Sequence, residues 1–391
     1  MGKLYYKNGY QKECTARILN HKVDSRGLWL QFDNNLFYPG GGGQSPDKGK
    51  IDNNDLQEIL EDEGIIWHCI TGNNTLQDGE EVHLQLDWPV RYQNMQQHSG
   101  QHLLSHVLWE KGLRTVSVHL GEINTMIEIE GDFPDDGLLH KVEDEANKLI
   151  RKAVPINTFF VDRVQAEALP LRKPAGDWAE LRIVEIDGMD YSACGGTHVQ
   201  NTSEIGLVKY TGSEKIRGHA RLKFVIGESA YAYFVQLNNV MNQLKESLQT
   251  DPTQFADKLN GLMNDISTLK KENNQLKKYF IKYQCNEIIK KTNVDSKIVI
   301  SEIADCNFDD IKEIAKVLAG EYQKISFIYG KGRFSLCAPE TGLFNTTDFM
   351  RKQGQLLGLK GGGPEGFVQG VCAGIREEKI KQMLTENINT K

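Results

Sequence analysis

Two histidines four residues apart, His98 and His102, lie in a segment whose composition favours a helix. Side chains at positions i and i+4 project from the same face of a helix, so both imidazoles can converge on one ion. A second pair, Cys194 and His198, flanks a flexible turn in the sequence Cys-Gly-Gly-Thr-His, which can aim both side chains inward. Imidazole and thiolate are the ligands that zinc prefers. Together the four residues predict a shared zinc site.

Residue spacing leaves two questions open at this candidate site. His106 continues the stripe of His98 and His102, so His102 with His106 is an equally spaced pair. Histidines that satisfy their hydrogen bonds inside a core, beside a buried thiol, are the alternative to a metal site. Four permanent protein ligands would make the ion structural. An exchangeable position would let zinc lower the pKa of bound water to about 7 and polarise an ester carbonyl, which supports hydrolysis at neutral pH.

Two glycine clusters are candidate contacts for RNA. Residues 37–49 hold four successive glycines, whose bare backbone N–H groups can closely approach a phosphate or a nucleotide end. Residues 358–370 hold a second cluster with three successive glycines. A flexible turn is the alternative interpretation of each segment. The candidate contacts are Gly41, Gly42, Gly43, Gln44, Gly361, Gly362 and Gly363.

Basic residues follow the Cys-Gly-Gly-Thr-His turn, in two predicted strands and the loop between them. They have little acidic competition beyond Glu214, which predicts a local surface for phosphate groups, although a solvated edge strand is equally compatible. The formal net charge of −7 argues against indiscriminate DNA binding but does not exclude such a local surface. The candidate RNA contacts are Lys215 and Arg217, with Lys209, Arg221 and Lys223 as neighbours.

Length and composition indicate a multidomain cytoplasmic protein. A chain of 391 residues is too long for one core, so about two to four domains are expected. The seven cysteines are scattered and odd in number, which suits reduced thiols. The amino terminus turns polar before a signal-peptide core could form, and no segment is apolar for long enough to span a bilayer. We therefore expect no membrane partner.

Four regions differ in their hydrophobic pattern, and together they predict an α+β fold class. Residues 1–90 alternate apolar and polar in short runs between turn residues, which predicts a β-barrel domain. Residues 91–227 combine the histidine helix with strands and a charged helix, as in an α+β zinc-binding domain. Residues 228–292 are a predicted long helical hairpin, and residues 293–391 a predicted α/β domain.

The helical region carries two apolar seams with alternating spacings of three and four residues. Asp251 as N-cap and Pro252 at the first helical position start the second helix. The seams should pack as a coiled-coil-like antiparallel hairpin or join another subunit, so a homodimer through the hairpin or the last domain is a further expectation. Asn273 falls in the second seam, where a polar residue would set the register.

The order of these motifs resembles the alanyl-tRNA editing proteins of the AlaX type, in the long form that keeps the C-terminal domain of alanyl-tRNA synthetase. The resemblance covers essentially the whole chain, from the glycine segment at residues 37–49 through the histidine helix and the Cys-Gly-Gly-Thr-His turn to the terminal glycine cluster. The chain departs from the family pattern at Gly40, where an acidic residue is usual, and at Ser45 and Pro46. It also lacks an arginine directly after the terminal glycine run.

This resemblance implies a trans-editing aminoacyl-tRNA deacylase, a zinc-dependent hydrolase of the ester between alanine tRNA and a wrong amino acid, chiefly serine, with glycine as a second candidate. It implies that His98, His102, Cys194 and His198 bind Zn²⁺, which leaves His106 on the helix surface or beside the ligands. It implies tRNA as the partner and a last domain that helps to bind tRNA or to dimerise. Nothing in the chain resembles the adenylate-forming domain of the synthetase, so we expect ATP-independent correction of charged tRNA.

Such an editor has a physical rationale. A site that selects alanine cannot strongly exclude the smaller glycine, nor fully reject serine, which adds one hydroxyl. A second pocket can use that hydroxyl as a hydrogen-bonding partner. We expect Thr197, our candidate catalytic-site residue, or a polar residue in the strand around residues 119–125 such as Thr125, to recognise it.

Two other functions remain compatible with the sequence. One is editing of another mischarged tRNA, because the fold is shared with the editing domain of threonyl-tRNA synthetase. The other is a non-catalytic tRNA-binding protein whose zinc is structural. Unfolding on metal removal would favour the structural ion.

Overall fold

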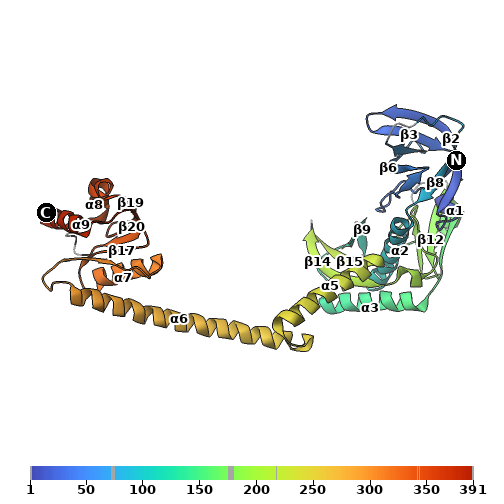
Figure 1. Ribbon diagram of the computed structural model, residues 1–391. Helices are drawn as coiled ribbons and strands as arrows, with labels where there is room; N and C mark the ends of the chain where they lie inside the picture. Colours follow the sequence, from blue (N-terminus) through green and yellow to red (C-terminus); the bar gives the residue numbers. More distant parts are fainter. Residues whose placement is uncertain are drawn as a thin grey trace. The chain divides into compact units, whose positions relative to one another are not determined.

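The computed structural model describes residues 2–71, 75–174, 180–216, 218–340, 342 and 344–389. The chain divides into two compact units, Met1–Ser247 and Leu248–Lys391 (Figure 1). Both units combine helices with sheets, so the predicted α+β class is confirmed. Within the described ranges, every helix is too short or too polar to cross a membrane. The domain boundaries predicted inside each unit stay predictions.

Six strands of the first unit form a closed sheet in the order β2-β3-β7-β6-β5-β8, in which β8 pairs again with β2. Residues alternate between the two faces of a strand, so β8 buries Val82, Leu84 and Leu86 and exposes the residues between them. Most buried side chains of these strands pack in one apolar cluster, and Trp29, Trp67 and Cys69 form a second, smaller one. The strands are β2 (Glu13–Asp24), β3 (Gly27–Phe32), β5 (Gly49–Ile51), β6 (Asn54–Asp62), β7 (Ile65–Ile70) and β8 (Glu81–Leu86), with the short β1 (Gly2–Lys3), α1 (Leu4–Lys7) and β4 (Asn34–Asn35).

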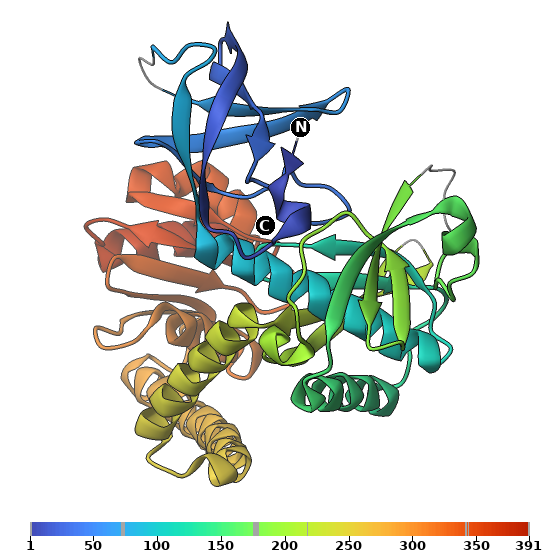
Figure 2. The same ribbon diagram turned by 90° about the vertical axis from the view of Figure 1, so that its right-hand side faces the viewer.

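Helix α2 (Trp88–Glu110) is the central element of the first unit and carries the predicted histidine pair (cyan in Figure 2). Its N-cap is Asp87, whose side chain accepts a hydrogen bond from the Val90 N–H, and Pro89 lies in its first turn. Every residue from 95 to 108 is buried, the polar ones included. Polar side chains on a buried helix must find partners inside the protein.

Two further sheets, in the orders β14-β15-β10-β9 and β11-β12-β13, belong to the same unit as α2. Gly100 lets α2 approach β15 closely, because a Cβ there would lie 2.7 Å from Ile226 Cγ2. The elements are β9 (Thr115–Leu120), β10 (Thr125–Ile129), α3 (Asp136–Lys152), β11 (Ile156–Asp162), α4 (Arg163–Glu167), β12 (Glu180–Ile186), β13 (Asp190–Ala193), η1 (Thr202–Ile205), β14 (Val208–Ile216) and β15 (His219–Ile226).

Strand β13 directly precedes the Cys-Gly-Gly-Thr-His turn. It pairs antiparallel with β12, with Ala193 opposite Ile183 and Asp190 opposite Ile186. The chain therefore enters the Cys-Gly-Gly-Thr-His turn from a hydrogen-bonded strand, which gives the turn a fixed starting point.

A buried ion pair joins the glycine segment to α2. The Asp47 carboxylate accepts hydrogen bonds from the Arg91 guanidinium, with 2.9 Å between Nε and Oδ1, and both side chains are 0% exposed. Arg91 also donates to the carbonyls of Gly9 and Leu36, at 2.9 and 3.0 Å. The Tyr38 N–H donates to Asp47 at 2.6 Å. The pair thus ties the residues on both sides of the four glycines to the first turn of α2.

Helices α5 (Glu228–Leu248) and α6 (Phe255–Lys291) form at the predicted positions, with the short 3-10 helix η2 (Pro252–Gln254) between them. Asp251 caps η2 by accepting a hydrogen bond from the Thr253 N–H, as its N-cap prediction requires. The α-helix begins one 3-10 turn later than predicted. Many apolar seam residues of both helices are exposed, and their packing as a hairpin or against a second subunit stays a prediction.

The second unit is built on a sheet in the order β16-β17-β18-β20-β19. Neighbouring residues of β17 point to opposite faces: Ile328 packs in one core with α6 and α7, and Phe327 in another with α8 and α9. The sheet is therefore covered on both faces (Figure 1). The elements are β16 (Ile298–Glu302), α7 (Phe308–Gly320), β17 (Ile325–Gly330), β18 (Arg333–Cys337), α8 (Thr346–Gln353), η3 (Gln355–Leu357), β19 (Leu359–Gly362), β20 (Phe367–Cys372) and α9 (Glu377–Asn389).

We expect Asp47→Asn to lower the free energy of unfolding of the first unit by about 3–5 kcal/mol, because Arg91 would keep a buried charge without its counter-ion. All five tryptophans precede residue 248, so tryptophan fluorescence during denaturant unfolding reports on this unit. The control is Glu81→Gln, which breaks an exposed pair with Arg17 and should cost about 0–1 kcal/mol. If the two substitutions lowered the free energy of unfolding equally, the stabilising role of the buried Asp47–Arg91 pair would be contradicted.

Candidate metal centre

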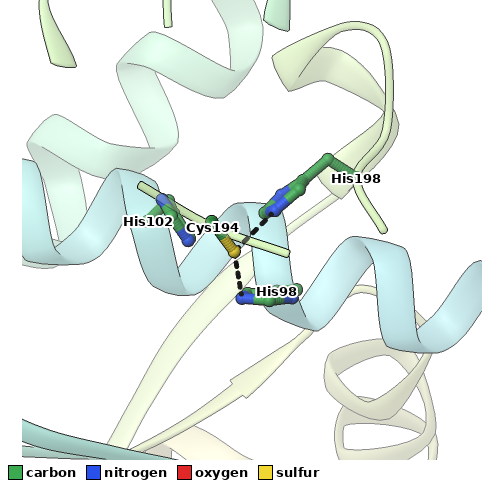
Figure 3. Close-up of side chains that lie close together, drawn as sticks. All are labelled: His98, His102, Cys194 and His198. Atoms are coloured by element: carbon green, nitrogen blue, oxygen red, sulfur yellow. Dashed lines mark hydrogen bonds between the residues drawn. The ribbon is translucent and has the colours of Figure 1, made fainter. Parts of the chain in front are cut away.

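The four predicted ligands meet in one cluster (Figure 3). One nitrogen from each of His98, His102 and His198 and the Cys194 sulfur all lie within 4.8 Å of one another. Cys194 Sγ is 3.3 Å from His98 Nε2 and 3.4 Å from His198 Nε2. Among the described residues, no other group of three or more histidines, cysteines and carboxylates is arranged to hold a metal ion.

His106 is not part of the cluster. Its Nε2 lies 3.7 Å from the Glu110 carboxylate and its Nδ1 lies 3.9 Å from Asp190. His106 lies one turn of α2 beyond His102, and its imidazole is not among the clustered groups. The ligand pair on α2 is therefore His98 with His102, and not His102 with His106.

The turn after β13 supplies the other two ligands and has no spare room. A Cβ at Gly196 would lie 2.2 Å from His98 Cε1 and 2.8 Å from Gln44 Oε1. A Cβ at Gly195 would have Tyr6 Oη as its nearest neighbour, at 3.1 Å. Glycine at 196 is therefore what allows the turn to lie directly against the His98 imidazole.

Hydrogen bonds at Nδ1 orient two of the three imidazoles. His98 Nδ1 is 2.8 Å from Gln44 Oε1, and His198 Nδ1 is 3.1 Å from Ser99 Oγ. When Nδ1–H donates to these oxygens, the Nε2 lone pair is left free for a metal. His102 Nδ1 is buried and has no hydrogen-bond partner in the described part of the chain. Of the three imidazoles, His102 is therefore the one whose Nδ1 no described protein group orients.

Gln44 connects the glycine segment to the metal centre. Its side chain is buried, its Oε1 also accepts a hydrogen bond from the Thr197 N–H at 3.0 Å, and its Nε2 donates to Thr197 Oγ1 at 2.9 Å. Both ends of the amide are thus engaged inside the protein. Of the predicted RNA contacts in this segment, Gly41, Gly42 and Gly43 are the exposed ones, and an RNA role for any of the four stays a prediction.

Burial keeps the three imidazoles neutral. It lowers the pKa of His98 to about 3, and burial together with the neighbouring imidazoles lowers the pKa of His102 and His198 well below the ordinary value. Burial raises the pKa of Cys194, and the Gly196 N–H, which donates to its sulfur, opposes that shift. Neutral imidazoles present free lone pairs, and a thiol binds zinc as the thiolate after releasing its proton. The donor set therefore fits a zinc ion.

Two arginines lie close to the cluster. Arg172 is paired with the Asp190 carboxylate and donates to Ser192 Oγ at 2.7 Å. Arg182 in β12 donates to backbone carbonyls of the cysteine turn. Residue types and spacing identify neither Arg182 nor Ser99 as parts of the site, nor Gln44 as a partner of His98. A charged residue inside the apolar run of β12 was the one signal that pointed to Arg182.

The expectation that the basic residues after the turn have little acidic competition is wrong. The carboxylate partners of Lys209 and Lys215, and one of the two partners of Arg221, come from segments distant in the sequence, which the local pattern cannot show. Lys215 is exposed and its contact with RNA stays a prediction, whereas Arg217 lies outside the described residues. The pairs are Lys215 with Asp132 at 3.2 Å, Lys209 with Glu143 at 2.8 Å, Arg221 with Glu128 at 2.6 Å and Lys223 with Glu214 at 2.6 Å.

The second glycine cluster makes a closely packed hairpin in the second unit. Gly361 of β19 lies opposite Gly370 of β20, and a Cβ on Gly361 would lie 2.0 Å from the Gln369 carbonyl oxygen. A Cβ on Gly363 would lie 2.2 Å from the Phe367 carbonyl oxygen. Close backbone approach explains these two glycines, and an RNA contact for residues 361–363 stays a prediction.

Comparison with known proteins gives matches along most of the chain. Residues 181–222 match the family model described as the threonyl and alanyl tRNA synthetase second additional domain. The chain is 28% identical to the alanyl-tRNA editing protein AlaX-L of Pyrococcus horikoshii, with 94% of both chains covered. It is 27% identical to the alanyl-tRNA editing protein Aarsd1 of Danio rerio, covering 92% of this chain and 88% of that protein.

Longer proteins and solved structures also match. The chain is 26% identical to the alanine–tRNA ligase of Pyrococcus abyssi, of which it spans 42%. A crystal structure of the exonuclease RecJ bound to manganese matches 35% of this chain at 12% identity with a TM-score of 0.26. That score is too low to support any conclusion.

We expect Gly196→Ala to abolish or strongly weaken zinc binding, because the added methyl group overlaps the His98 imidazole. The measurement is zinc affinity by competition with a chromophoric chelator, with bound metal counted by elemental analysis. Gly195→Ala is the matched control, since its methyl group meets only the end of the Tyr6 side chain. Wild-type affinity in the Gly196 variant would refute the packing argument.

Proposed function

We propose, from the relationship of this chain to the alanyl-tRNA editing proteins of the AlaX type, that it is a zinc-dependent aminoacyl-tRNA hydrolase that edits mischarged alanine tRNA in trans. The similarity along nearly the whole chain to AlaX-L supports editing of tRNA. The convergence of three imidazoles and one thiol is the observation that carries the metal-dependent hydrolysis.

His98, His102, Cys194 and His198 would hold the ion. Bound zinc supplies a Lewis acid that polarises an ester carbonyl and lowers the pKa of water. Gln44 fixes the ring of His98 by accepting from its Nδ1, so that Nε2 is the atom presented to the ion. The ring orientation is therefore set before any substrate arrives, which avoids reorganisation during the reaction.

Burial of the three histidine ligands limits the access of bulk water to the centre, while Cys194 is half-buried. The three histidines are each at most 7% exposed, and the helix and turn that carry them are joined through Gln44. Electrostatic interactions are stronger in such a site than in water, so a polarised carbonyl is better stabilised. These properties suit ester hydrolysis better than a flexible surface site would.

Serine is the proposed amino acid on the mischarged tRNA, with glycine as the second candidate. A serine hydroxyl needs a polar partner in the pocket. Thr197 lies between Cys194 and His198 in the turn, and its oxygen accepts from Gln44, which leaves its O–H able to donate elsewhere. Thr125 Oγ1 in β10 is buried without a hydrogen-bond partner in the described structure, so it is the second candidate.

The proposed tRNA contacts begin at the exposed glycines 41–43. They precede Gln44 directly, so an RNA end held by the backbone N–H groups of Gly42 and Gly43 would lie next to the candidate metal centre, whereas the Gly41 N–H already donates to the Gln44 carbonyl at 3.0 Å. We further propose that Lys215 contacts phosphate, and that the second unit binds tRNA through residues 361–363 or forms a homodimer. The exposed apolar seams of α5 and α6 support a partner surface.

The test is deacylation of Ser-tRNA, Gly-tRNA and Ala-tRNA that carry the alanine acceptor stem. We expect hydrolysis of Ser-tRNA, protection of Ala-tRNA, and loss of activity in Cys194→Ala, which removes a ligand. Hydrolysis of threonine tRNA charged with serine tests the alternative function, in which the protein edits another mischarged tRNA. Absence of hydrolysis of every substrate would defeat the proposal.

Removal of zinc separates a catalytic ion from a structural one. We expect a chelator to abolish deacylation while tryptophan fluorescence and far-UV circular dichroism stay native, because the first unit has extensive apolar cores of its own. Added zinc should restore activity. Unfolding on chelation would instead favour a non-catalytic protein with a structural ion.

Valine substitution tests the two threonines. We expect Thr197→Val or Thr125→Val to narrow the ratio of Ser-tRNA to Ala-tRNA hydrolysis by about 5- to 150-fold, since loss of one hydrogen bond to a substrate hydroxyl is worth about 1–3 kcal/mol. The rates on the two substrates are compared at equal enzyme concentration. Unchanged discrimination in both variants would exclude both residues.

A further inference from the structure

Arg182 is an ionic residue in a strand that otherwise enters the core. It lies in β12, its side chain and backbone are 9% exposed in total, and its neighbours Leu181, Ile183 and Val184 are buried. Placing a guanidinium there costs free energy unless the charge is compensated. The burial of this charged side chain therefore needs a structural or functional explanation, and its contacts supply one.

Every hydrogen bond recorded for Arg182 outside its pairing with β11 goes to the cysteine turn. Its carbonyl accepts from the Cys194 N–H at 3.0 Å. Its Nη1 donates to the Cys194 carbonyl at 2.9 Å and to the Gly196 carbonyl at 2.8 Å. One guanidinium nitrogen therefore bridges two carbonyls that flank Gly195, and it closes the turn between the ligand Cys194 and the residue packed on His98.

An aromatic ring fixes the guanidinium from another side. The Arg182 group lies 5.0 Å from the centre of the Tyr6 ring, within the range of a cation–π contact. Within the described residues, no carboxylate accepts a hydrogen bond from Arg182. In this respect it differs from Arg91 and Arg172, which are paired with Asp47 and Asp190.

We propose that Arg182 is a positioning residue of the metal centre, whose guanidinium bridges the carbonyls of Cys194 and Gly196 and so holds the turn in the shape that brings the cysteine sulfur and the His198 imidazole to His98. This inference rests on the proposed metal site. It gives β12 a role in the site beside the four ligand residues. The ligands alone do not set the path of the chain between Cys194 and His198, and Arg182 of β12 does.

Lysine cannot replace this arrangement. Its ammonium ends one bond closer to the backbone than Nη1, and it lacks the planar group that lies over the Tyr6 ring. Arg182→Lys therefore keeps the charge but loses the bridge, whereas Arg182→Met keeps much of the length and removes the charge. If both variants lose zinc affinity to a similar extent, the bridge between the two carbonyls, and not the positive charge, is what the metal centre requires.

The experiment measures metal affinity in the full-length chain, by chelator competition for zinc and by the thiolate-to-metal absorption of the cobalt-loaded protein. We expect Arg182→Lys and Arg182→Met to bind zinc about 10- to 100-fold more weakly than wild type, the usual effect of removing a residue that orients ligands. The cobalt band should shift or weaken. Arg172→Lys is the matched control, because Arg172 bonds to Asp190 and Ser192 instead of the turn, and it should keep the wild-type spectrum.

Chemical rescue keeps the test decisive if the methionine variant fails to fold. Arg182→Ala should regain part of its zinc affinity on addition of guanidinium ion at concentrations that leave tryptophan fluorescence native, and methylammonium should give no rescue. Wild-type affinity in the lysine and methionine variants would overturn the inference and leave the proposed function standing. Failure of the wild-type protein to bind zinc would overturn both.

Discussion

The first unit depends on one buried electrostatic contact, between Arg91 and Asp47. Removing either partner would leave a charge in a region that water does not reach, so the closed sheet and the central helix are committed to a single relative position. Gln44 lies three residues before Asp47, and His98 lies two turns of helix after Arg91. The hydrogen bond between Gln44 and His98 thus joins two residues whose backbones are already fixed to one another. The geometry of the metal centre follows from a contact outside it.

Around the four candidate ligands, polar atoms are arranged by residues that are not themselves candidate ligands. Gln44 links the helix to the turn, Ser99 orients His198, and Arg182 closes the turn from behind. Burial makes each of these hydrogen bonds more valuable, because water cannot replace it. The same burial keeps the imidazoles neutral and therefore able to bind a cation. Stability and the proposed metal binding thus use the same few interactions, so the cluster of candidate ligands is formed by the fold itself.

Local sequence patterns were sufficient for the β-rich character of the first ninety residues, for the histidine helix and for the pairing of Cys194 with His198 across one turn, and the resemblance to the AlaX type was needed to choose the full ligand set. They did not distinguish His106 from His98 as the partner of His102. Spacing shows which residues share one side of a helix, but not which other part of the chain packs against that side. Gln44 was grouped with the exposed glycines beside it, although its side chain turns inward. The acidic partners of the basic strand residues, Glu128 and Glu143 among them, lie in other elements. Each of these features depends on contacts between residues far apart in the sequence. Neither a hydrophobic period nor a short motif can show such contacts.

The contact between Gly196 and His98 bears on how related chains should be judged. A glycine codon becomes an alanine codon by a single base change, and the product would retain all four ligand residues. A survey that checks only histidines and cysteine would count such a chain as an intact enzyme, although one methyl group occupies the space of an imidazole. Inactive descendants of this fold can therefore be hidden among sequences with a complete ligand set, and the small residue between the ligands is the better marker of decay.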